Sequence, residues 1–250
     1  AAAELSDGRF PLLPLNLASN WREFRAALAE FPGPGLNFIY ADRDGNIGHQ
    51  VAGRIPLREG FTGELPVEGD TGASEWRGAI PFEQLPSYFN PAPGRVISAN
   101  QNPFPASVPY PVSGSFAAPY RQRQIDARLT AREGWQPPEM LSVQTDVYSA
   151  FSHFLARSAA EAATRKQAGS GELSEAVNLL AAWHGRMDRS RAAPVLVENL
   201  YREVRRRLAV SAAPKTGARY RFETAPGAVE ALLRERPTGW VADWEQMLVD

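Results

Sequence analysis

Two short apolar runs around an Asp-Gly turn constrain the fold of this 250-residue chain more than any other feature. Residues 36–41 and 47–51 are rich in β-prone side chains, and the segment between them, 42–46, reads Asp-Arg-Asp-Gly-Asn. Glycine tolerates the positive φ of a tight turn, and short apolar runs on either side of such a turn are typical of paired strands. The sequence therefore predicts an antiparallel β-hairpin here.

The turn also contains an Asp-x-Asp-Gly-Asn pattern that superficially resembles a calcium loop. It lacks the further ligands and the distal glutamate of an EF-hand. The chain has no cysteine, and its three histidines, His49, His153 and His184, show no spacing typical of a metal site. We predict no metal site and no cofactor, and we assign the histidines to structural positions.

An amphipathic helix is predicted just before the hairpin. Asn20 offers its side chain as a helix cap, and Glu23 completes a capping box. The apolar residues that follow at spacings of three and four are Trp21, Phe24, Leu28 and Phe31. We expect this stripe to pack against a sheet, until the Pro-Gly segment at 32–35 ends the helix.

Between residues 56 and 93 the chain is rich in proline, glycine and single aromatic side chains, which favours short strands, turns and a helical turn near 82–85. Trp76 and Tyr88 are candidate walls of a pocket for an apolar group, and a role in a small satellite core explains them equally well.

Next, residues 96–99 favour an extended backbone, and Pro103 holds Asn102 outside the helical region. This predicts a strand that carries Asn100 and Asn102 on one face. Their amides can donate to a developing oxyanion, or they can serve as ordinary turn residues before a proline.

The pattern is helical from residue 120 onward. Helices are predicted at residues 121–129, 138–164, 174–183, 192–208, 227–234 and from 243 onward, with a linker at 166–171. We therefore divide the chain into an α+β portion, 1–115, and a helical region, 116–250.

Three arginines at 205–207 suit the C-terminal end of a helix dipole, and they do not by themselves indicate nucleic acid. The 27 basic and 28 acidic residues balance, and no apolar run has the length of a membrane span, so neither nucleic acid nor membrane is expected as a partner.

In their order along the chain, several motifs closely resemble the β-chain of the penicillin acylase family, whose members are N-terminal-nucleophile hydrolases. The resemblance runs from about residue 16 to the C-terminal end and is strongest over residues 37–102. The motifs are NFIYADRDGNIG (37–48), GRIP (53–56), ELPV (64–67), EWRG (75–78), IPFEQLP (80–86) and SANQN (98–102).

The resemblance implies an α+β chain, with part of the layered αββα hydrolase fold followed by a mainly helical C-terminal region. In the family, an N-terminal serine attacks an amide with its own α-amino group as the base, because an α-amino group has a pKa near neutrality. The family's oxyanion-hole asparagine matches Asn102. The family's arginine ahead of an Ile-Asp pair matches Arg121, which would orient Asn102; an exposed arginine at a helix start is the structural alternative.

Two departures qualify the resemblance. Ala1 matches a point well inside the family's β-chain, so the serine is expected to lie outside this chain. This chain is then an internal fragment, inactive alone, whose partners are the α-chain and the N-terminal part of the β-chain. Gly114 stands where the family often has an aspartate calcium ligand after a Tyr-Pro pair, so the calcium site is not transferred. No signal peptide is seen, and a periplasmic or secreted parent is implied by the resemblance alone.

The predicted activity of the parent is hydrolysis of the amide bond of small N-acyl compounds, such as β-lactam side chains or acyl-homoserine lactones, through an acyl-enzyme. The acyl group is not specified by the sequence. Two alternatives are a non-catalytic binding or assembly module that keeps the acylase fold, and an unrelated helical interaction protein.

Overall fold

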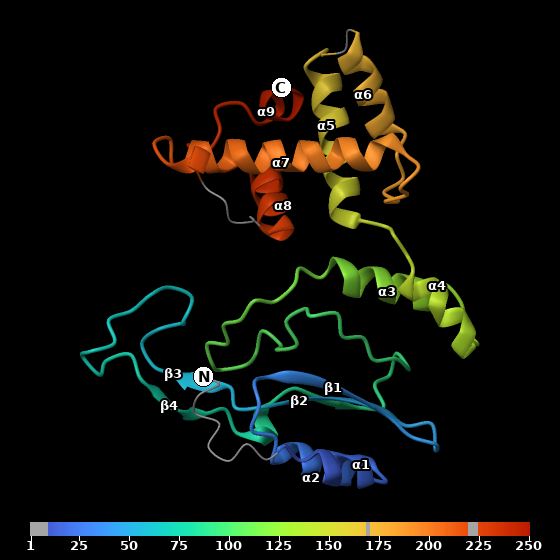
Figure 1. Cartoon of the computed structure of the whole chain (residues 1–250), viewed down its shortest axis with the longest axis vertical. Helices are drawn as coiled ribbons and strands as arrows, with labels where there is room; N and C mark the ends of the chain where they lie inside the picture. Colours follow the sequence, from blue (N-terminus) through green and yellow to red (C-terminus); the bar gives the residue numbers. More distant parts are fainter. Residues whose placement is uncertain (1–9, 169–170, 220–224) are drawn as a thin grey trace. The chain divides into compact units, whose positions relative to one another are not determined.

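The computed structural model describes residues 10–168, 171–219 and 225–250. The chain divides into two compact units, Ala1–Ala117 and Ala118–Asp250. Figure 1 shows that the described strands belong to the first unit and the long helices to the second. We call them the sheet unit and the helical unit.

Three antiparallel strands form the main sheet of the sheet unit, in the order β1-β2-β5. Their bounds are β1 Leu36–Ala41, β2 Ile47–Ala52 and β5 Ser87–Phe89. In register, His49 of β2 lies opposite Ile39 of β1 on one side and opposite Tyr88 of β5 on the other. The predicted hairpin is confirmed.

The Asp-Gly turn between β1 and β2 is held by the carboxylate of Asp42. Its Oδ1 accepts the backbone N–H groups of Asp44 at 3.0 Å and Asn46 at 2.9 Å, while its Oδ2 accepts the Tyr40 hydroxyl at 2.8 Å and the Asn46 amide at 2.9 Å. These donors, the Asn46 amide foremost, lower the pKa of Asp42. Burial and the bond to Asp42 raise the pKa of Tyr40 to about 12. Both oxygens of the carboxylate are thus engaged by the turn itself.

Two helices cover one face of this sheet, as Figure 1 shows: α1 (Leu12–Leu17) and α2 (Trp21–Ala29). The Asn20 side chain accepts the N–H of Glu23 at 3.0 Å, which confirms the predicted cap, while the Glu23 carboxylate accepts the N–H of Ser19 at 2.8 Å. Leu28 of α2 packs with Phe31 and with Ala52 of β2 in a small core. The predicted stripe therefore packs against the sheet.

The opposite face of the sheet is covered by the irregular part of the chain. Because side chains alternate along a strand, His49 and Val51 face away from Gln50 and Ala52. Val51 packs with Ile80 and Leu85 in a second core. On this side β3 (Pro56–Arg58) pairs with β4 (Trp76–Ala79) in a smaller sheet. The 3₁₀ turn η2 (Phe82–Gln84) confirms the helical turn expected there, and its Phe82 packs against both cores.

The helical unit is built around one alanine-rich helix, α5 (Ala150–Arg165). Figure 1 shows the long α7 (Ala192–Ala212) crossing it. Leu155 of α5, Val197 and Val204 of α7 and Val229 of α8 (Pro226–Glu235) are completely buried in one core. The unit also contains α3 Tyr120–Thr130, α6 Glu172–Ala181, η4 Gly217–Arg219 and α9 Trp244–Val249. Within the described ranges, no helix is both long enough and apolar enough to cross a membrane.

The single helix predicted over 138–164 is wrong, because the chain breaks there. It forms η3 (Pro137–Met140) and the short α4 (Leu141–Gln144) before α5 begins. Tyr148 pairs instead with Arg186 in an isolated antiparallel bridge, and Ser149 caps α5 by accepting the N–H of Ser152. A tertiary contact and a cap therefore overcome the helical pattern. The predicted linker at 166–171 lies partly outside the described residues.

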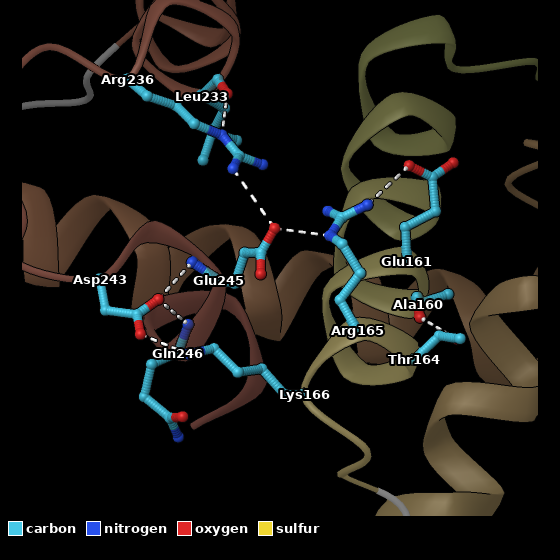
Figure 2. Close-up of polar contacts among 10 residues, drawn as sticks. All are labelled: Ala160, Glu161, Thr164, Arg165, Lys166, Leu233, Arg236, Asp243, Glu245 and Gln246. Atoms are coloured by element: carbon cyan, nitrogen blue, oxygen red, sulfur yellow. Dashed lines mark hydrogen bonds and ion pairs between the residues drawn. The ribbon is translucent and has the colours of Figure 1, made fainter.

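Charged side chains attach α9 to α5 and α8, as Figure 2 shows. Arg165 of α5 donates through Nε to Glu245 Oε1 at 2.5 Å, and the same oxygen receives Arg236 of the α8 C-cap at 3.4 Å. Asp243 caps α9 by accepting the N–H groups of Glu245 and Gln246, and it also pairs with Lys166. The short terminal helix is thereby held by its charges as well as by its apolar face.

Candidate functional site

The segment that carries Asn100 and Asn102 is not a strand, which corrects the prediction for residues 96–99. Asn100 has φ +65°, in the left-handed region, so the two asparagines do not share a strand face. The Gln101 side chain takes the place of a ladder partner: its Oε1 accepts the N–H of Ala99 at 2.7 Å, and its Nε2 donates to the carbonyl of Ile97 at 3.1 Å. The segment is a locally bonded loop.

Asn102 is exposed, and its carboxamide is oriented by the loop. Its Oδ1 accepts the backbone N–H of Phe104 at 3.0 Å, as in an Asx turn. A carboxamide has an acceptor end and a donor end, so the turn occupies the oxygen and leaves Nδ2 able to donate. Within the described part of the chain, Nδ2 donates to no other residue. Chemically, this is a neutral donor that keeps its form at any ordinary pH.

Tyr88 lies beside this loop. Its hydroxyl donates to the carbonyl of Pro103 at 3.5 Å, and its ring stacks on His49 with centroids 5.4 Å apart. About half of the side chain is exposed. The structure therefore brings Tyr88 next to Asn102, whereas Trp76 lies on β4 opposite Arg58, in the smaller sheet.

Arg121 lies in the first turn of α3, in the helical unit. It lines a cavity of about 760 Å³ together with Ile125, Phe151 and Tyr201. Asn102 belongs to the sheet unit, whereas Arg121 belongs to the helical unit. The surroundings of each residue are therefore given within its own unit. The orienting role of Arg121 stays a prediction.

A cleft of about 530 Å³ in the sheet unit was not foreseen from the sequence. Asn100 and Gln101 form part of its wall, and Asn37, Arg54 and Arg58 contribute an amide and two guanidinium groups. Its apolar wall comes from Leu36, Val51, Ile55, Phe104, Val112 and Phe116. The GRIP motif was the sequence signal that could have pointed to this cleft, because it contains Arg54. Neither Asn102 nor Trp76 nor Tyr88 lines the cleft.

His49 supports the edge of this cleft from inside the sheet. It is buried, and its Nε2 lies 2.8 Å from Oδ1 of Asn37. Burial lowers the pKa of His49, so the ring is neutral near pH 7. Because an amide oxygen only accepts, Nε2 carries the proton, and Nδ1 is left without a partner among the described residues. This bond turns the donor end of Asn37 away from the histidine.

Comparison with known proteins identifies the family. The family model described as penicillin amidase matches residues 4–248. The penicillin acylase 2 proenzyme of Pseudomonas sp. (strain SE83) is 29% identical over 218 residues, which cover 83% of this chain and 28% of that protein. Penicillin G acylase of Escherichia coli is 36% identical over 129 residues, covering 47% and 15% respectively. The acyl-homoserine lactone acylase QuiP of Pseudomonas fluorescens (strain Pf0-1) is 32% identical over 138 residues, covering 55% and 17%.

A solved structure gives the same result for the fold. The thermostable penicillin G acylase from Alcaligenes faecalis superposes with a TM-score of 0.69 at 19% identity, over 96% of this chain and 49% of that one. This confirms the predicted α+β class and its N-terminal-nucleophile hydrolase fold. The chain spans less than a third of the length of each of the three curated relatives. With the family model matched over nearly all of its residues, the chain belongs to the penicillin amidase family.

Proposed function

We propose that the protein to which this chain belongs hydrolyses the amide bond of small N-acyl compounds, with Asn102 as a donor of its oxyanion hole. The family assignment supports the reaction class, since the relatives are named as acylases of penicillins and of acyl-homoserine lactones. The observation that carries the role of Asn102 is its bonding: the loop binds the carboxamide oxygen and leaves the amide hydrogens unbonded among the described residues.

In the proposed mechanism, a serine outside these residues attacks the carbonyl carbon of the substrate, and its α-amino group accepts the hydroxyl proton. The carbonyl oxygen becomes an oxyanion, to which Nδ2 of Asn102 donates. The C–N bond then breaks, the amine leaves with a proton, and water hydrolyses the acyl-enzyme. A fixed neutral donor favours this path because it needs no reorganisation when the charge develops.

Further parts of the proposal follow the family pattern. Arg121 orients Asn102, while Tyr88 and Trp76 contribute walls for the acyl group. Tyr88 has support from its bond to Pro103, next to Asn102. The remaining acylase segments, an α-chain and the N-terminal part of the β-chain, are the proposed protein partners, and the parent is proposed to be periplasmic or secreted. This chain alone is proposed to be inactive.

The test is hydrolysis of a chromogenic N-acyl amide by the full-length gene product and by two variants of one residue. Asn102→Ala removes the donor, whereas Asn102→Asp keeps an oxygen for the Phe104 N–H but removes the amide hydrogens. Loss of one such donor costs about 10²- to 10³-fold in kcat, so both variants should lose at least that much. Asn178→Ala is the matched control, because it removes an exposed asparagine in α6.

Full activity of Asn102→Ala would contradict the role given to this residue. An unmodified gene product that folds and matures but hydrolyses none of a panel of N-acyl amides would favour a non-catalytic binding or assembly module with the acylase fold.

A further inference from the structure

We propose that the cleft of the sheet unit binds a small organic acid, with its carboxylate on Arg54 and Arg58 and its apolar body against the opposite wall. This site is separate from the donor role of Asn102, which does not line the cleft, and its test measures binding rather than hydrolysis.

The charge of the cleft is uncompensated. Arg54 precedes β3, and Arg58 ends it. The lining residues include no aspartate or glutamate, and no ion pair joins either arginine to another residue of the described chain. Two other arginines of the sheet unit do pair with carboxylates, Arg25 with Glu83 and Arg77 with Glu59. A cleft that holds two such cations without a carboxylate favours an anionic ligand.

Arg58 lies against a neighbouring loop. The side chain is only partly exposed, and a Cβ added at Gly63 would come within 2.8 Å of its Nε. The planar guanidinium can form the two parallel hydrogen bonds that a carboxylate accepts.

A neutral donor adds to these cations. The buried His49 binds Oδ1 of Asn37 at 2.8 Å, and Asn37 lines the cleft. The amide hydrogens of Asn37 are therefore available to an acceptor in the cleft. Because Nε2 of the neutral ring faces this oxygen, it donates there, which keeps the asparagine in this orientation.

The remaining wall selects an acid with an apolar body over a bare anion. Leu36, Ile55, Phe104 and Phe116 supply aliphatic and aromatic surface. A volume of about 530 Å³ is in the usual range for small-molecule sites, and it exceeds what phosphate or acetate can fill. A carboxylate on a short aliphatic or aromatic chain matches both sides of the cleft.

The test uses the purified 250-residue chain, shown to be folded by circular dichroism, and two ligands of the same shape. Binding of 4-phenylbutyrate and of its neutral amide, 4-phenylbutyramide, is measured by ligand-observed NMR titration. We expect the acid to bind at least about tenfold more tightly, since charge-assisted bonds exceed neutral ones by about that factor. The variant Arg54→Gln/Arg58→Gln should abolish this preference. Arg43→Gln, an exposed arginine of the hairpin turn that does not line the cleft, should preserve it.

A second variant tests the site without removing an arginine. Asn37→Asp is nearly isosteric and places a negative charge in the cleft, so it should weaken binding of the acid by about tenfold or more and leave the amide unchanged. The proposal would be overturned if the acid did not bind, or if it bound no more tightly than the amide. It would also be overturned if Arg43→Gln reduced the preference for the acid as much as Arg54→Gln/Arg58→Gln does. Equally tight binding of inorganic phosphate would overturn the role of the apolar wall. Each outcome is independent of whether Asn102 contributes to hydrolysis.

Discussion

A buried glutamine on the helix-covered face of the sheet gives the sharpest test of how the sheet unit is held together. Gln50 of β2 is completely buried. Its Oε1 accepts from Nε of Arg25 at 2.9 Å, and its Nε2 donates to the carbonyl of Val51 at 2.7 Å. Arg25 continues to Glu83 at 2.7 Å and lies over the ring of Phe82. One arginine thus joins α2, β2 and η2.

Loss of the Arg25–Gln50 hydrogen bond and loss of the Arg25–Glu83 ion pair should lower the free energy of unfolding by different amounts. Arg25→Met leaves Gln50 Oε1 buried without its donor, and an unsatisfied buried acceptor costs about 1–3 kcal/mol. Glu83→Ala removes an ion pair whose carboxylate is 74% exposed, and such surface pairs contribute about 0–1 kcal/mol. Arg25→Met/Gln50→Leu removes both polar partners together, so it should cost less than the sum of the two single variants.

The assay is native-state hydrogen exchange of the β2 amides, among them the Val51 N–H that donates to Pro86. Because these amides lie in the sheet unit, their opening free energies report this unit without the helical one. A Glu83→Ala cost equal to that of Arg25→Met would show that the ion pair, and not the buried glutamine, dominates. Additive costs in the double variant would show that Arg25 and Gln50 are not coupled.

Two further predictions concern the cores. Burial lowers the pKa of His49, so as pH falls below about 6.5 the unfolded chain binds a proton that the folded chain does not. The stability of the sheet unit should therefore fall with pH from there to the folded pKa and change no further below it; urea unfolding between pH 7.5 and 5 checks this, and His49→Phe should remove that part of the dependence. Leu155→Ala, at a position with no exposed surface, should destabilise the helical unit by about 2–5 kcal/mol in thermal unfolding followed by circular dichroism. The control Leu179→Ala, at a position 40% exposed, should change stability by about 0.5 kcal/mol or less.

The elements that sequence reasoning found are those with local causes. The Asn20 cap and the Asp-Gly turn are each made by residues within four positions of one another, so their signals lie in the sequence itself. The helix over 138–164 failed because the break depends on the bridge between Tyr148 and Arg186, which are distant in the chain. The cleft also combines separate segments, since Asn37, Arg54 and Asn100 come together only through the fold.

The strand predicted at 96–99 failed for a related reason. Apolar, β-branched residues favour an extended chain, but a strand exists only where another strand accepts its backbone bonds. Among the described residues, the Gln101 side chain takes two of these bonds, and Asn100 adopts a positive φ. β-propensity alone does not specify which partner a backbone group finds.

The loop also changes how the two explanations of Asn102 relate to each other. From the sequence, an asparagine before a proline was either a turn residue or an oxyanion donor. In the structure the turn uses Oδ1, and an oxyanion would use Nδ2, so one carboxamide can serve both purposes. The turn would then be the means of positioning, because holding the oxygen on the Phe104 N–H determines where the amide hydrogens point. Asn102→Asp separates the two roles, since it retains the acceptor for the turn and replaces the donors by a carboxylate oxygen.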